Sequence, residues 1–264
     1  MRNLWVISRL TIADLLHRKV LYALAGLIVL NGILLLAGLI VGSYYMADGD
    51  AIRQMGAPLL GMYSSLLSTL GRVSFLILAF VAFWSEFSRG TVVMLISKSA
   101  TRTQFFLGKF FGLAVLAAAY TLLTGVFATL MSVVLQSSVP TTLLFHQLET
   151  FVLMAITIAS AFLFLSYFNI AAAVVAWVLL YAVSTILWIF LQIQVPFLTQ
   201  AARATRYLFP ATYTFDSSQQ LALQVAPARG LWETYFPIIH GLDYAALLLL
   251  AGLFLFYRRD LLVR

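Results

Sequence analysis

The chain has 264 residues, of which 63% are hydrophobic and only 9% are charged, and its net charge is +7. A soluble domain of this length carries about 25% charged residues, so 16 basic and 9 acidic side chains are too few to cover a soluble surface. The composition also excludes a disordered chain and a coiled coil, and the absence of cysteine excludes a disulfide-stapled module; the chain is expected to lie in a lipid bilayer.

Apolar runs long enough to cross a membrane occur along the whole chain. A helix needs about 20 apolar residues to cross roughly 30 Å of hydrocarbon. The first three such runs cover residues 20–42, 62–84 and 105–135. Residues 1–19 precede them as a basic cytosolic segment, which is predicted to form an interfacial helix, with a simple basic flank of the first span as the alternative.

The next apolar run, residues 151–193, is too long for one span, because a single helix of that length would measure about 65 Å. We expect a turn at Tyr167-Phe168-Asn169, since Asn tolerates the left-handed conformation that ends helices. The run then divides into spans over 151–166 and 170–193. A sixth span covers 237–257.

The predicted fold is an all-α membrane protein with six transmembrane helices in one domain, 1–264. Residues 194–236 form its outer segment, with aromatic residues at headgroup depth. Six spans place both termini on one side. With the termini in the cytosol, eleven Lys and Arg lie in cytosolic segments and four in outer ones, so the positive-inside rule predicts cytosolic termini. Because the basic residues lie in short segments between apolar runs, the pattern does not indicate nucleic-acid binding.

The segment between the second and third spans is more ordered than a simple connector. It begins with Glu86 and breaks at Gly90, and the apolar run 91–96 that follows is too short to cross a membrane. Thr101 and Gln104 then have the spacing of a capping box, which predicts a new helix. A short cytosolic helix with apolar residues must be buried against headgroups or another protein.

This segment resembles the corresponding part of the ABC type-2 permeases. The match rests on an acidic residue, a Gly-Thr pair, an apolar helix and a closing Gly-Lys, which stand here as Glu86, Gly90-Thr91, Leu95, Thr103 and Leu107-Gly108-Lys109. The resemblance implies that a coupling helix in this stretch docks on a separate ATP-hydrolysing subunit. The residues it implies for coupling are Glu86, Gly90, Thr91, Leu95, Arg102, Thr103, Gly108 and Lys109.

The chain itself lacks the phosphate-binding motif G-x-x-x-x-G-K-[ST], because Gly108-Lys109 is followed by Phe110. It is therefore expected to be a non-catalytic subunit that binds no cofactor, with ATP and Mg held by the partner ATPase. The resemblance further implies a second permease copy or a similar permease, and an exporter. The expected location is the plasma membrane of a prokaryotic cell, with multiple passes. The substrate is not indicated.

Three ionisable residues in the spans are candidates for a substrate pathway. Arg72 either faces a cavity that receives an anionic substrate or headgroup, or marks the start of a tilted second span, with its guanidinium reaching outward. We favour the second interpretation. His240 and Asp243 share one helix face near the outer end of the sixth span. The three histidines lack metal-ligand spacing, so no metal site is predicted.

Three other classes of protein remain as alternatives. An intramembrane enzyme would need H-E-x-x-H or a Ser/His pair in the bilayer, and neither pattern occurs. An ion-coupled secondary transporter would need carboxylates within the spans. Of these, Asp243 lies within a predicted span, whereas Glu86 and Glu149 fall at span edges. A membrane assembly factor, with or without an ATPase partner, is the third alternative.

Overall fold

The computed structural model describes residues 2–17, 49–88, 101–136, 141–192 and 231–258, together with a few single residues: Tyr22, Gly26, Val29, Gly32, Ile33 and Gln200. In this part of the chain every regular element is an α-helix and no strand occurs. The helices are α1 (Arg2–Leu16), α3 (Gly49–Ser88), α5 (Arg102–Gln136), α6 (Thr141–Tyr167), α7 (Ile170–Gln192) and α10 (Leu231–Arg258).

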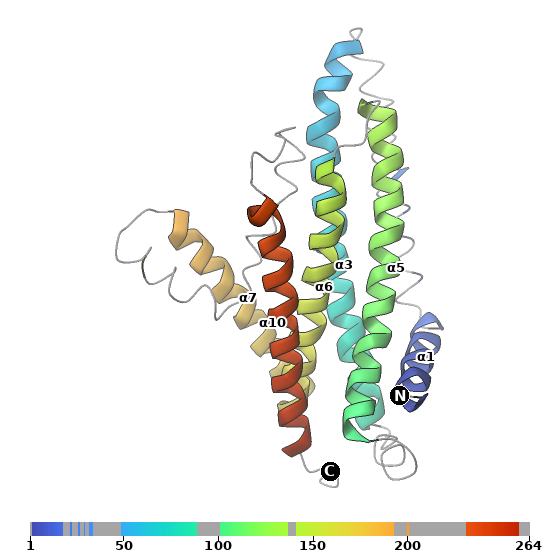
Figure 1. Ribbon diagram of the computed structural model, residues 1–264, viewed down its shortest axis with the longest axis vertical. Helices are drawn as coiled ribbons and strands as arrows, with labels where there is room; N and C mark the ends of the chain where they lie inside the picture. The colour runs from blue at the N-terminus through green and yellow to red at the C-terminus, as the bar shows by residue number, and fades with distance from the viewer. Residues whose placement is uncertain are drawn as a thin grey trace.

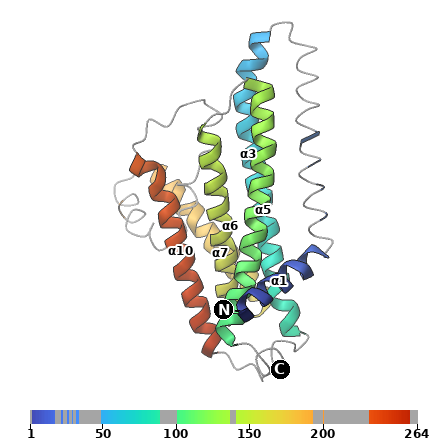
Figure 2. The same cartoon turned by 45° about the vertical axis from the view of Figure 1, so that its right-hand side comes forward.

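The long helices form a bundle around α6. Helix α6 packs against α3, α5, α7 and α10, and 78% of its apolar stretch is buried. Helices α3, α5, α6 and α10 run side by side along the long axis, whereas α7 leans away from them (Figure 1). Helix α1 is short and lies across the base of α5 (Figure 2).

Four of these helices are long and apolar enough to cross a membrane: Leu60–Glu86, Arg102–Val133, Leu143–Tyr167 and Tyr235–Arg258. A shorter apolar helix covers Ile170–Ile186. Their outer faces carry large hydrophobic side chains that are largely exposed, as expected where lipid rather than protein covers a helix. The chain is therefore a multi-pass membrane protein.

The predicted spans 62–84, 105–135 and 237–257 fall within α3, α5 and α10. The first predicted span, 20–42, and the outer segment 194–236 lie almost entirely outside the described residues. The fourth predicted span, 151–166, falls within α6, which begins ten residues earlier at Thr141. In the sequence Pro140 precedes this helix directly, and proline is common at helix starts.

The turn between α6 and α7 lies where the sequence predicts it. Helix α6 ends at Tyr167 and α7 begins at Ile170. The Asn169 Oδ1 atom accepts a hydrogen bond from the backbone N–H of Ala172 at 2.9 Å. Asn169 therefore acts as the N-cap of α7, satisfying one of the free N–H groups at the start of the helix, and this differs from the helix-ending role expected of it.

Candidate functional site

The described coupling residues lie together at one end of the bundle. Glu86 is in the last turn of α3, and the others are in the first two turns of α5. We call this region the junction and define it by five residues: Glu86, Arg102, Thr103, Gly108 and Lys109. At this end the base of α5 meets α1 and the last turn of α10 (Figure 1). Three further predicted coupling residues, Gly90, Thr91 and Leu95, lie outside the described residues.

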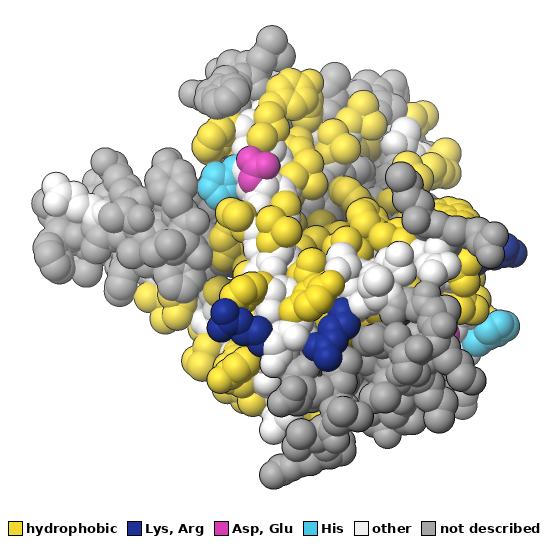
Figure 3. Space-filling view, turned by 60° about the horizontal axis from the view of Figure 1, so that its bottom comes forward, with side chains coloured by type: hydrophobic (Ala, Val, Ile, Leu, Met, Phe, Trp, Pro, Cys, Tyr) yellow, Lys and Arg dark blue, Asp and Glu magenta, His cyan; other side chains and the backbone are white. Residues whose placement is uncertain are grey.

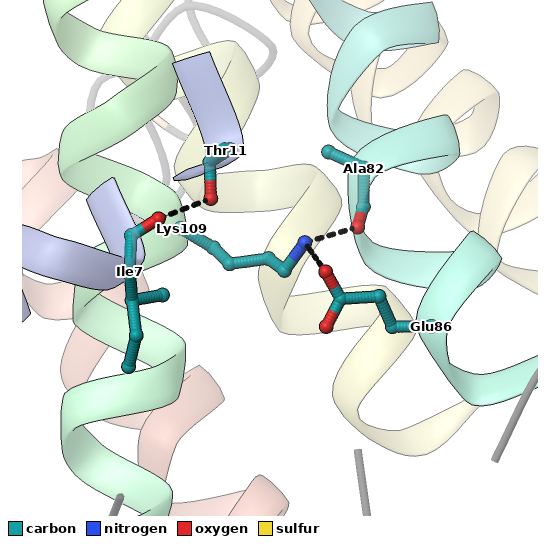
Figure 4. A network of polar contacts seen from close by, with 5 residues as sticks. All are labelled: Ile7, Thr11, Ala82, Glu86 and Lys109. Carbon is teal, nitrogen blue, oxygen red and sulfur yellow. Dashed lines mark hydrogen bonds and ion pairs between the residues drawn. The ribbon is translucent and has the colours of Figure 1, made fainter. Parts of the chain in front are cut away.

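A buried ion pair joins α3 to α5 at the junction. The Lys109 ammonium pairs with the Glu86 carboxylate and donates a hydrogen bond to the Ala82 carbonyl oxygen at 2.8 Å (Figure 4). The Lys109 side chain is 3% exposed and that of Glu86 is 25% exposed. A buried cation is stable only when it is paired and hydrogen-bonded. The pair therefore fixes the two helix ends on either side of residues 89–100.

Two other junction residues hold the end of α10. The Arg102 Nη1 atom donates a hydrogen bond to the Tyr257 carbonyl oxygen at 2.7 Å. The Thr103 Oγ1 atom lies 2.7 Å from the Tyr257 hydroxyl oxygen. The last carbonyls of a helix lack partners within the helix, and a cation there also interacts favourably with the helix dipole. Arg102 thus caps α10, a contact between residues more than 150 positions apart.

The predicted capping box at the start of α5 is confirmed in both directions. The backbone N–H of Gln104 donates to Thr101 Oγ1 at 3.2 Å, and the backbone N–H of Thr101 donates to Gln104 Oε1 at 3.1 Å. These bonds satisfy two N–H groups that have no partner within the helix. The start of α5, where residues 89–100 rejoin the bundle, is therefore fixed locally.

Helix α1 packs on α5 at two glycines. A Cβ atom added to Gly108 would lie 2.8 Å from Ile7 Cγ2, and one added to Gly112 would lie 3.0 Å from the Ser8 carbonyl oxygen. Only glycine allows the two backbones to approach this closely. The Thr11 hydroxyl at this contact donates to the Ile7 carbonyl oxygen at 2.8 Å (Figure 4). The N-terminal helix is thus attached to the same turns of α5 that carry Lys109.

A cluster of phenylalanine rings supports the junction from within the bundle. Phe83 of α3 contacts four other rings, with centroid distances of 5.0–6.4 Å. All five rings are fully buried. Edge-to-face ring pairs add stabilisation beyond the area they bury. The cluster joins α3, α5, α6 and α10, and its members are Phe83, Phe105, Phe106, Phe162 and Phe256.

The surface at this end is basic as well as apolar. Seen from the junction end, basic side chains stand among hydrophobic ones (Figure 3). Arg258 is exposed, and its guanidinium lies 4.4 Å from the ring centroid of Phe254. Arg9 of α1 is exposed as well. Such a surface suits anionic headgroups or an acidic partner.

Arg72 lies in the middle of a membrane-spanning helix. The apolar stretch of α3 begins at Leu60, twelve residues before Arg72 and about 18 Å away along the axis. Helix α3 continues for many residues on both sides of Arg72, and where the span begins relative to Arg72 stays a prediction. The Arg72 Nη2 atom donates to Thr69 Oγ1 at 3.2 Å, and its Nε atom is buried without a hydrogen-bond partner in the described part of the chain. A charge at this depth costs several kcal/mol unless water or a partner compensates it.

The other two candidates for a substrate pathway lie on α10. His240 is partly buried, and its ring packs edge-on against Phe236 with a centroid distance of 5.8 Å. Asp243 is exposed on the same helix, nine residues into the apolar stretch. Arg72 lies on α3 instead. The described residues contain no group of three or more metal-ligating side chains that could hold a metal ion.

Two buried ionisable residues were missed by the sequence reasoning. His146 and Glu149 are 4% and 7% exposed and lie one turn apart in the apolar stretch of α6. The sequence placed Glu149 at the edge of the span 151–166 and His146 before it, whereas both lie within α6, which begins at Thr141. Pro140 was the signal that could have moved the helix start and brought both residues into the span.

The fold and the junction define a class, a multi-pass α-helical membrane protein whose helices are tied together at one end. A family described as "Protein of unknown function (DUF2705)" matches residues 19–262. The match covers all five long helices and leaves α1 outside it. The chain therefore belongs to this family. No curated protein matches the sequence.

Proposed function

We propose that this protein is the membrane-spanning subunit of an ATP-driven ABC-type exporter, coupled to a separate ATPase through residues 86–109. The observation that carries this proposal is the buried Glu86–Lys109 ion pair. It joins the two helix ends that flank residues 89–100, so a force on that segment would reach both helices together. A passive connector needs no such buried pair, which is costly to desolvate.

The junction gives this force a path into the bundle. Lys109 of α5 pairs with α3, and Gly108 of α5 packs against α1. Arg102 and Thr103 of α5 contact the end of α10. A partner that moved the segment would therefore move four helices as a unit. Closure of an ATPase pair could shift two such subunits between two conformations, provided that each ATPase state binds one conformation more tightly.

The proposal includes the finer topology: six spans, both termini in the cytosol, and the junction at the cytosolic side. Basic side chains at the junction end and the position of α1 and the end of α10 there support this orientation. We further propose that the complex contains two permease subunits and two ATPase subunits, with ATP and Mg bound in the latter.

A site-specific crosslinking experiment tests the coupling. A photoreactive residue at Val93, within the segment expected to dock, is compared with one at Val115, which is 48% exposed in the apolar part of α5. We expect Val93 to crosslink to a chain that hydrolyses ATP, and Val115 to lipid or to no ATPase. Crosslinking of Val93 without any ATP-hydrolysing partner, or labelling of Val93 from the outer side, would refute the proposal.

A second candidate function is supported by one observation. His146 and Glu149 are buried ionisable residues in the span of α6, and such residues are typical of ion-coupled secondary transporters. In that case the purified chain alone should move substrate in liposomes under a proton or sodium gradient, and Glu149→Gln should abolish the flux. Flux that requires both ATP and an ATPase chain would favour the exporter.

A further inference from the structure

We propose that Arg72 anchors a binding site for an anionic phosphate or carboxylate group, carried by an amphipathic ligand that enters from the bilayer. The site lies halfway along the apolar stretch of α3, where Arg72 donates a hydrogen bond to the Thr69 hydroxyl of its own helix. It is separate from the junction and needs no ATPase partner to bind its ligand. Only the further step, that the ligand is the exported substrate, rests on the proposed function.

The first argument is the unused hydrogen-bonding capacity of Arg72. A guanidinium has five N–H donors, and in the described part of the chain that of Arg72 makes one hydrogen bond, to Thr69. Its Nε atom is shielded from solvent and has no partner there, and no described acidic side chain forms an ion pair with the group. The Arg72 charge therefore remains available to an anion.

The second argument is the direction of the hydrogen bond between the Thr157 and Tyr181 hydroxyls, of which the Tyr181 hydroxyl lies within the electrostatic reach of Arg72. The Thr157 hydroxyl donates its single proton to the Leu153 carbonyl oxygen at 2.8 Å. The Tyr181 hydroxyl, 3.0 Å from Thr157 Oγ1, must then be the donor in their hydrogen bond. The Tyr181 oxygen therefore offers only its lone pairs to other groups. This uncharged oxygen interacts electrostatically with Arg72. A neutral hydroxyl can orient a guanidinium but cannot neutralise it.

The third argument is that Tyr181, the described hydroxyl within electrostatic reach of Arg72, is held in place. Trp177 donates its indole N–H to Ser160 Oγ at 3.2 Å, and its ring lies against that of Tyr181 with a centroid distance of 4.1 Å. Tyr181 is thus fixed by both a hydrogen bond and a ring contact. Because the Tyr181 proton is engaged by Thr157, the donors for an anion come from the Arg72 guanidinium, whose planar fork suits bidentate binding of phosphate or carboxylate. At this depth a ligand with an apolar tail is favoured over a fully hydrated ion.

The test measures binding to the full chain purified in a neutral detergent, without ATP. The probes are dioctanoyl phosphatidic acid, dioctanoyl phosphatidylcholine and inorganic phosphate, with affinities from calorimetry or native mass spectrometry. We expect saturable binding of phosphatidic acid that weakens about tenfold or more in Arg72→Gln, since a charge-assisted pair is lost. Arg72→Lys should bind with intermediate affinity, because it keeps the charge but loses the planar fork.

Arg258→Gln is the matched control: it removes an exposed arginine of the basic surface at the end of α10, so it measures general attraction of headgroups to that surface and should weaken binding far less than Arg72→Gln. Equal binding of phosphatidic acid by wild-type protein and a folded Arg72→Gln or Arg72→Lys variant would overturn the proposal. Displacement of phosphatidic acid by equimolar inorganic phosphate would also overturn it as stated, by assigning the site to a soluble anion. Failure of the crosslinking at Val93 would leave these results untouched, so the two proposals can fail separately.

Discussion

The junction and the middle of the bundle both contain a cationic side chain on a long apolar helix, but the two cations have different partners. At the junction, Lys109 meets a carboxylate and a carbonyl oxygen from α3. In the middle of the bundle, Arg72 makes one hydrogen bond within the described part of the chain, to the Thr69 hydroxyl of its own helix. The surrounding packing differs too, because five interlocked phenylalanine rings lie under the junction, whereas α7 leans away from the other helices (Figure 1).

Lys109 is a structural charge, because its partners lie within the chain, whereas the Arg72 charge can be paired by a ligand. Both cations cost free energy to remove from water. The chain itself supplies a carboxylate and a carbonyl oxygen to Lys109, so this cation is compensated without any ligand. For Arg72 the described part of the chain supplies little, so an outside anion can contribute most. Changes at the junction should therefore affect stability and rigidity, and changes around Arg72 should affect binding.

The largest expected effect is that of Glu86→Ala, which removes the carboxylate that pairs with the buried Lys109 ammonium and leaves its hydrogen bond to the Ala82 carbonyl oxygen and its contact with the Phe105 ring. We expect a loss of about 3 kcal/mol in the free energy of unfolding, at the low end for a broken buried pair because the Glu86 carboxylate is partly exposed. Unfolding by denaturant in mixed micelles, followed by circular dichroism, measures it.

The double variant Glu86→Ala/Lys109→Met serves as the control, because it removes both charges. It should recover most of the lost stability, since no uncompensated charge remains buried. If the double variant were as unstable as Glu86→Ala, the loss would come from packing at the helix ends, and the contrast with Arg72 would no longer rest on charge compensation.

The next effect in size concerns the attachment of α1. In Gly112→Ala the new methyl group would lie 3.0 Å from the Ser8 carbonyl oxygen, which is backbone and cannot rotate away. We expect a loss of about 1–3 kcal/mol and faster proteolysis of α1 at Arg9. Gly26→Ala is the matched control, since nothing lies within 4 Å of the added atom. Equal protease resistance in both variants would show that α1 is not held by this contact.

The features that sequence reasoning predicted correctly are local ones. The capping box of Thr101 and Gln104 and the turn at 167–169 depend on residues within four positions of each other. Their hydrogen bonds follow from side-chain chemistry and helix geometry alone. The early start of α6 was also predictable, because Pro140 is a local signal that the hydropathy pattern hides.

The contacts between helices could not be predicted in the same way. Lys109 is 27 residues from Ala82, and Arg102 is 155 residues from Tyr257. In membrane helices both the lipid-facing and the protein-facing sides are apolar, so periodicity does not distinguish a buried Phe83 from an exposed Phe111. The resemblance named the junction residues but gave no partners for them.

The smallest expected effect tests the middle of the bundle. Tyr181→Phe removes the hydroxyl that donates to Thr157 while keeping the ring against Trp177. Hydrogen bonds between membrane helices contribute about 0.6 kcal/mol on average, so we expect a loss of that size in the same unfolding assay, with Tyr22→Phe, at an exposed position, as the control. A loss as large as that of Glu86→Ala would mean that this hydroxyl chain stabilises the bundle as much as the junction does, and the contrast between the two regions would fail.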